Sequence, residues 1–210
     1  MSAVDLKKSY LRVKEDYGGT FNAQDRVGTY GCIFCVGIYF QIGSSKASCA
    51  HIHPRSDGNG IQIFPSEAEG AKLKSGTVKR LTSHAKENGW SAETVDKASV
   101  VMVCPLPDHA TNVAAGCQSK HHAFAKRPGW YVIEGIKEFL GLAPSFKVDT
   151  ESQGFVVDGG KDQPVIKVPF DTGDPEFEDV RVEALKDLVE AEAGGDRNWN
   201  CEDWDLDGDE

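Results

Sequence analysis

Residues 31–53 read GCIFCVGIYFQIGSSKASCAHIH, two apolar runs separated by a polar one. Residues 33–42 are rich in β-branched and aromatic side chains, which predicts a buried strand. The polar sequence GSSK at 43–46 predicts a turn, and residues 47–53 predict a second strand. The two strands would pair as an antiparallel hairpin. We therefore place a β-hairpin in the first quarter of the chain.

C-terminal to this hairpin, the sequence alternates between helical and extended patterns. The predicted elements are a helix at 66–88 with Ser66 as its N-cap, a strand at 98–104, a helix at 131–140, short strands at 145–148, 154–158 and 165–168, and an amphipathic helix at 179–193. This order predicts a mixed, layered α/β domain, in which the run of short strands pairs mostly antiparallel.

Charge is distributed unevenly along the 210 residues, which carry a net charge of −10. Residues 171–210 hold three basic and sixteen acidic residues, so the rest of the chain is close to neutral. The acidic run is typical of a solvated tail. We divide the chain into an N-terminal segment at 1–25, an α/β domain at 26–170, an amphipathic helix at 171–195 and a disordered acidic tail at 196–210.

Several classes of function are disfavoured by the sequence. No concentrated basic stripe is present, so no nucleic-acid partner is expected. No run approaches the roughly 18 apolar residues of a membrane span, and no secretory signal is visible, so we expect a cytoplasmic protein with reduced cysteines. Phosphate-loop, dinucleotide-binding and serine-hydrolase motifs are absent from the sequence. No cofactor is expected.

The best candidate reactive centre is Cys32 together with His51. Cys32 opens the first strand of the hairpin, and His51 lies near the end of the second. Because the strands run antiparallel, these two ends meet at one edge of the sheet. A cysteine nucleophile needs a base and an oxyanion donor. Gly31 would leave the Cys32 amide free to bind an oxyanion, and the imidazolium would lower the pKa of the Cys32 thiol.

These residues resemble the chemoreceptor glutamine deamidases of the CheD type and, more distantly, the deamidases of the cytotoxic necrotizing factor type. The likeness spans about residues 26–168. The matching features are Thr29-Tyr30-Gly31, Cys32, the apolar strand to Ile42, Ala50-His51, Pro54, the order of the later helices and strands, and the turn at Gly159-Gly160.

The resemblance implies an α/β/β layered fold with a mixed, largely antiparallel sheet, here with an acidic C-terminal tail. It also implies a cysteine-dependent amidohydrolase, a protein-glutamine deamidase, whose partner is a protein substrate with an exposed glutamine. Cys32 would be the nucleophile and His51 the base, with Thr29, or alternatively Asp25, orienting the imidazole. The alternative is a non-catalytic binding or regulatory protein that retains the fold.

Metal and redox sites are the competing hypotheses. Five side chains close together in the sequence are of the types that bind zinc. They are Cys32 and Cys35 of a C-x-x-C motif, Cys49, His51 and His53. On a strand, however, residues three apart point to opposite faces, which disfavours shared ligation by the two cysteines. The same strand prediction disfavours a redox pair. Weaker candidates are Cys117 with His121-His122, and the calcium-loop-like sequence at 203–208, which lacks its closing glutamate.

Overall fold

The structure is a computed structural model that describes residues 8–54, 65–105, 127–159, 164–169, 184–201 and 204. Its elements, in chain order, are β1 (Lys8–Arg12), β2 (Gly18–Asn22), β3 (Val27–Tyr30), β4 (Val36–Ile42), β5 (Lys46–Ile52), α1 (Glu67–Glu87), the 3₁₀ turn η1 (Ala92–Thr94), β6 (Val95–Val103), α2 (Pro128–Leu140), β7 (Ser152–Val157), β8 (Val165–Pro169) and β9 (Leu188–Glu192).

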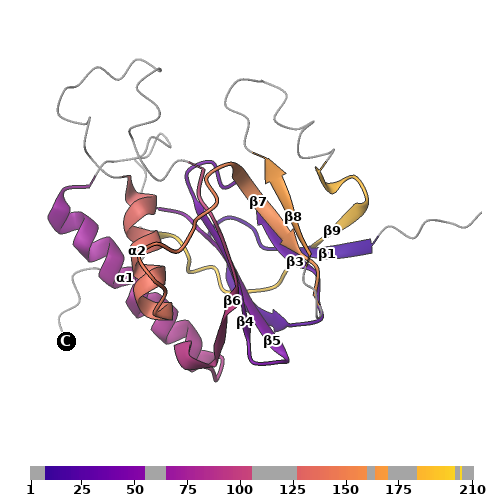
Figure 1. The fold of residues 1–210 in the computed structure, drawn as a ribbon, viewed down its shortest axis with the longest axis horizontal. Coiled ribbons are helices and arrows are strands. Elements are labelled where there is room, and N and C mark those ends of the chain that lie inside the picture. The colour runs from indigo at the N-terminus through magenta and orange to yellow at the C-terminus, as the bar shows by residue number, and fades with distance from the viewer. Residues whose placement is uncertain are drawn as a thin grey trace, which may run out of the picture.

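The described strands form two sheets that lie face to face. One is antiparallel, with the strand order β2-β5-β4-β6, and the other is mixed, with the order β8-β7-β3-β1-β9. Helices α1 and α2 pack on each other and cover the outer face of the first sheet, while the second sheet covers its inner face (Figure 1). The layered α/β/β fold with a mixed, largely antiparallel arrangement is therefore confirmed.

Strand β4 explains why the apolar run in the sequence is almost continuous. Ile38 and Phe40 point into the core beneath the helices, whereas Tyr39 points into the core between the sheets. Its neighbour β5 divides in the same way, with Ile52 on the helix side and Cys49 on the sheet side. A strand covered on both faces needs apolar residues at consecutive positions. His51 shares the inner face with Cys49, because residues two apart lie on the same side of a strand.

Most predicted elements are present with shifted ends. The helix predicted at 66–88 is α1, which begins with a capping box between Ser66 and Glu69. The strands predicted at 98–104, 154–158 and 165–168 are β6, β7 and β8. The strand predicted at 145–148 is not present. The first strand of the hairpin begins at Val36 instead of residue 33, because residues 31–35 form a bend.

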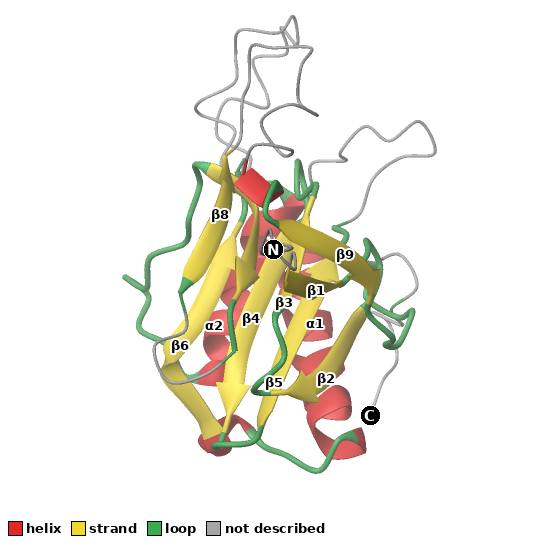
Figure 2. Ribbon diagram, turned by 90° about the vertical axis from the view of Figure 1, so that its right-hand side faces the viewer, coloured by secondary structure: helices red, strands yellow, loops and turns green. Residues whose placement is uncertain are grey.

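The amphipathic helix predicted at 179–193 is wrong over its described end. Residues 188–192 form strand β9, paired in parallel with β1, where the pattern predicts a helix (Figure 2). Pairing with an edge strand outweighed the helical pattern, and Glu190 anchors β9 by accepting hydrogen bonds from Tyr10 and Arg12. Within the predicted N-terminal segment at 1–25, strands β1 and β2 each belong to one of the sheets. Among the described residues, no helix is long and apolar enough to cross a membrane.

Residues 193–201, here called the strap, dock on the body and correct the prediction of a disordered tail for this part. The amide and carbonyl of Asp196 pair with those of Gly18. Further along, the Trp199 amide donates to the Asp16 carbonyl, and His53 exchanges backbone hydrogen bonds with Trp199 and Cys201. The Trp199 side chain is fully buried. The described part of the acidic terminus is therefore a structural element.

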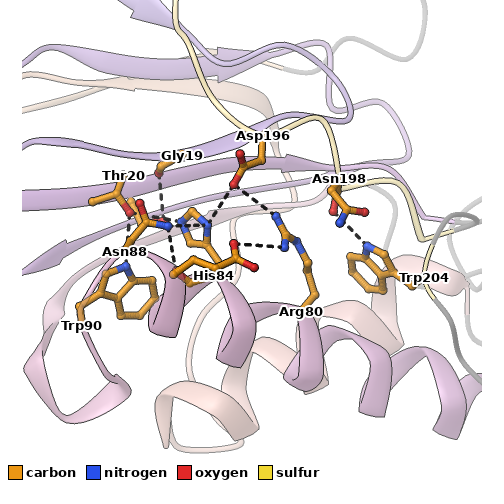
Figure 3. A network of polar contacts seen from close by, with 11 residues as sticks. Gly19, Thr20, Arg80, His84, Asn88, Trp90, Asp196, Asn198 and Trp204 are labelled. Atoms are coloured by element: carbon orange, nitrogen blue, oxygen red, sulfur yellow. Dashed lines mark hydrogen bonds and ion pairs between the residues drawn. The ribbon is translucent and has the colours of Figure 1, made fainter. Parts of the chain in front are cut away.

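A polar network joins the strap to helix α1 (Figure 3). The Asp196 carboxylate lies 3.6 Å from the Arg80 guanidinium and 3.9 Å from His84 Nδ1. The other nitrogen of His84, Nε2, lies 3.2 Å from Thr20 Oγ1. The Trp199 ring packs edge-on against His84 and lies beneath the Arg80 guanidinium. His84 is thus enclosed by α1, β2 and the strap.

We predict that the enclosure of His84 makes the protein sensitive to acid. Burial, and then the nearby Arg80 charge, lower the pKa of His84 from 6.5 to about 4, although Asp196 opposes this shift. Between these two pH values the unfolded chain binds the proton more readily, so stability falls as the pH drops from 6.5 to 4. The loss attributable to His84 is on the order of 3 kcal/mol.

Urea unfolding of wild type and His84→Gln at pH 7, 5.5 and 4 measures this dependence. The free energy of unfolding should fall more steeply in wild type than in the variant. Parallel pH dependences in the two proteins would show that protonation of His84 is not coupled to folding.

Candidate functional site

Cys32, His51 and Thr29 converge from three separate segments in the space between the two sheets. Cys32 lies in the bend at 31–35, which connects β3 of one sheet to β4 of the other. Thr29 is on β3, and His51 is on β5, directly opposite Gly37 of β4. The absence of a side chain at Gly37 leaves room for Cys32, since a Cβ there would lie 3.1 Å from the Cys32 sulfur.

The imidazole of His51 contacts both predicted partners through the same nitrogen. The Cys32 sulfur lies 3.9 Å from His51 Nδ1, and Thr29 Oγ1 lies 2.8 Å from it. The Thr29 hydroxyl also lies 2.8 Å from the Val13 carbonyl, to which it donates. In that arrangement Nδ1–H donates to Thr29, and the lone pair of the ring is on Nε2. Thr29 therefore sets the tautomer of His51, and rotation of its hydroxyl would reverse it.

Asp25, the alternative orienting residue, lies elsewhere. Its carboxylate accepts a hydrogen bond from the Asn22 amide, within the turn between β2 and β3. The structure brings Thr29 to His51, and the described contacts of Asp25 stay within its own turn.

The pair is closed off from solvent and uncharged at neutral pH. Cys32 is fully buried and His51 is 2% exposed. Burial raises the pKa of the Cys32 thiol well above its ordinary value, with a smaller contribution from Cys104. Burial also lowers the pKa of His51 to about 3, assisted by the nearby charge of His53. The expected low pKa of the thiol is thus not found in this structure, because desolvation disfavours both charged forms.

The predicted oxyanion donor is also engaged in this state, which is a correction. The Cys32 amide donates to the Gln153 carbonyl on β7 at 2.8 Å. Gly31 is exposed, has a φ of 84°, and has no atom within 4 Å of the position a Cβ would take. The glycine therefore permits the turn into the bend, but it does not free the amide that follows.

The positions of the other candidate metal ligands differ from those predicted. Because residues 31–35 form a bend, Cys32 and Cys35 both belong to the core between the sheets, and the prediction that they point to opposite faces of a strand is wrong. Cys49 is buried, and burial raises its pKa well above the ordinary value. The two weaker candidates lie outside the described residues. They are Cys117 with His121-His122, and the acidic motif that begins at Asp203, of which only Trp204 is described.

Glu15 is the site residue that the sequence did not suggest. It lies in the turn between β1 and β2, where its Oε1 accepts from the Cys35 thiol at 3.4 Å and lies 3.4 Å from His53 Nδ1. Asp16, in the same turn, is 3.5 Å from His53. Burial raises the pKa of the Cys35 thiol well above its ordinary value. No motif links Glu15 to Cys35 along the chain, since only the packing of the turn against the bend brings them together.

A cavity of about 250 Å³ lies away from this pair. Its lining comes from β6, from β8 and from the segment before β7, and includes Met102, Lys147, Asp149 and Lys167. Neither Cys32 nor His51 contributes to it.

Comparison of the chain with protein-family models, with curated proteins and with solved structures finds no match.

Proposed function

We propose that this chain is a cysteine-dependent amidohydrolase of the protein-glutamine deamidase type, with Cys32 as nucleophile, His51 as base and Thr29 as a positioning residue. The observation that carries the proposal is the convergence of these three side chains, at 3.9 Å and 2.8 Å around His51 Nδ1, from three different segments. A nucleophile next to a base, itself oriented by a third group, is the arrangement that covalent catalysis requires. Membership of the CheD-like family is part of the same proposal.

The chemistry would proceed through a thioester. This step needs the His51 tautomer that is protonated at Nε2, which follows if the Thr29 hydroxyl rotates away from the Val13 carbonyl. The Cys32 thiol then transfers its proton to His51 Nδ1, and the sulfur attacks the carbonyl carbon of a glutamine side chain. The C–N bond breaks as His51 returns the proton to the leaving nitrogen, and ammonia departs. Water then attacks the thioester carbon, which gives glutamate and restores the Cys32 thiol. The substrate would be a protein in the cytoplasm that exposes a glutamine.

Catalysis requires the bend at 31–35 to move, because Cys32 is covered in the closed state. The bend is not part of either sheet, and it exposes two large apolar side chains, Ile33 and Phe34, each more than a third exposed. Its displacement would break the hydrogen bond from the Cys32 amide to Gln153. One movement would then uncover the sulfur and release an N–H group to stabilise the oxyanion.

The alternative is a binding or regulatory protein in which the thiol is only part of the core. The observation that favours it is the complete burial of Cys32, together with the raised pKa of its thiol. The two proposals differ in whether the bend opens while the rest of the fold stays intact.

Native-state alkylation distinguishes them. With iodoacetamide at neutral pH, we predict that Cys32 reacts roughly tenfold faster than Cys49 or more, because opening a bend costs less free energy than opening a strand inside a sheet. Peptide mapping by mass spectrometry gives the rate at each cysteine. Cys49 is the internal control, since it is equally buried and lies on β5, the same strand as His51.

A Cys32→Ala variant verifies the assignment of the fast site. If Cys32 and Cys49 are modified at one common rate, that of global unfolding, the bend does not open and the binding-protein alternative is the better description.

A further inference from the structure

A second set of chemically competent side chains lies beside the thiol–imidazole pair. A carboxylate oxygen of Glu15, the sulfur of Cys35 and a ring nitrogen of His51 all lie within 4.8 Å of one another. They come from the turn between β1 and β2, from the bend at 31–35 and from β5. The fold thus brings one oxygen, one sulfur and one nitrogen donor to a single point.

The spacing of these donors suits a small tetrahedral ion. With zinc-to-ligand distances of about 2.0–2.3 Å, the ligand atoms of a tetrahedral site lie about 3.3–3.8 Å apart. Glu15 Oε1 and Cys35 Sγ are already 3.4 Å apart. Small adjustments of side-chain torsion angles would bring the His51 nitrogen from within 4.8 Å to the same range.

The hydrogen bonding of His51 is an independent indication of a ligand. Its Nε2 is buried and has no hydrogen-bond partner among the described residues. A buried nitrogen without a hydrogen-bond partner is energetically unfavourable. The other ring nitrogen, Nδ1, contacts Thr29 Oγ1, and the Thr29 hydroxyl donates its hydrogen bond to the Val13 carbonyl. A histidine that binds a metal through one nitrogen commonly donates from the other to an oxygen acceptor, and Thr29 supplies that acceptor.

We propose that Glu15, Cys35 and His51 form a binding site for a divalent cation, and that Zn²⁺ is the ion this donor set favours. Thiolate and imidazole together select zinc over magnesium or calcium, which prefer oxygen ligands. When the ion binds, the Cys35 thiol loses its proton to the solvent, and the resulting thiolate coordinates the metal. The Glu15 side chain is 54% exposed and offers a route of entry, while His53 keeps its contact with Asp16.

This site is separate from the proposed hydrolase activity but shares one residue with it. A metal on His51 would occupy the imidazole that Cys32 needs as its base. Zinc is therefore expected to inhibit thiol chemistry at Cys32, and chelation to restore it. The zinc site itself does not depend on whether the chain is a hydrolase.

Metal titration of the full, chelator-treated chain tests the site. Equilibrium dialysis against Zn²⁺ alone should give one ion per chain. Substituted Co²⁺ should give the intense visible bands of a tetrahedral site and a sulfur-to-cobalt charge-transfer band. Cys35→Ser should remove the charge-transfer band, and Glu15→Gln should weaken zinc binding by roughly tenfold or more. The exposed Glu15 makes the second substitution a safe one for folding.

Two control variants separate this site from the proposed catalytic one. Cys49→Ala and Cys32→Ala should both keep stoichiometric zinc, although Cys32→Ala would abolish any hydrolase activity. Less than one zinc per chain at saturation, or zinc affinity unchanged in both Cys35→Ser and Glu15→Gln, would overturn the assignment. Thermal unfolding of each variant confirms that it is folded.

Discussion

Replacing Trp199 by alanine should lower the free energy of unfolding by about 3–5 kcal/mol, which is the usual cost of deleting a large buried aromatic side chain. Trp199 is fully buried against Gly18, and it packs on Arg80 and His84 of α1. Loss of the Trp199 side chain would leave a cavity, and it would also weaken the attachment of the strap to the body. Urea unfolding at neutral pH, followed by circular dichroism, measures the change.

Arg197 provides the matched control for this prediction. It lies two residues away in the same strap but is exposed, so Arg197→Ala should change stability by less than about 0.5 kcal/mol. Deletion of residues 196–210 should destabilise at least as much as Trp199→Ala, because it also removes the backbone pairing with Gly18 and His53. If the deletion variant had the same free energy of unfolding as the full-length chain, the strap would not contribute to the stability of the fold.

Loss of the Cys32 sulfur should abolish deamidation, and loss of the base should nearly do so. Cys32→Ala removes the only atom that forms the thioester, so no residual covalent turnover is expected. His51→Gln removes general acid–base catalysis, which typically contributes about 10²–10⁴-fold. Because both side chains are buried, the folded state of each variant needs to be checked by its thermal midpoint. His53→Gln is the matched control, because His53 follows directly after β5 and lies in contact with Glu15 and Asp16.

Much of the central architecture could be predicted from local patterns. The hairpin of β4 and β5 follows from two apolar runs around a polar turn, and its antiparallel pairing brings His51 to the end where Cys32 lies. Helix α1 carries its own start signal in the Ser66 capping box. These elements are determined by interactions between residues close in sequence, so the sequence pattern is informative about them.

The elements that the sequence did not reveal depend on contacts distant along the chain. Strand β9 forms by pairing with β1, about 180 residues earlier, as the Tyr10–Glu190 contact shows. Its residues also fit a helical pattern, and only the partner strand decides between the two. The burial of Trp199 likewise depends on its packing against residues of α1 and β2, which lie far from it along the chain.

The candidate site shows the same division. The proximity of Cys32 to His51 follows from hairpin geometry, whereas the role of Glu15 depends on how the turn after β1 packs against the bend. The strand expected to begin at residue 33 placed Cys32 and Cys35 on opposite faces, and the actual bend brings both into one core. An error of three residues in a strand boundary thus changed which side chains could act together.

Comparison of deamidation by the wild-type chain and by Cys32→Ala is the direct test of Cys32 as the nucleophile. Each protein is incubated with an unfolded, glutamine-rich protein such as casein, and ammonia release is followed together with glutamate formation by mass spectrometry. We predict ammonia release by wild type and by His53→Gln, and none above background by Cys32→Ala. Equal release by wild type and Cys32→Ala, or no release by wild type from any glutamine-bearing protein offered, would contradict this prediction.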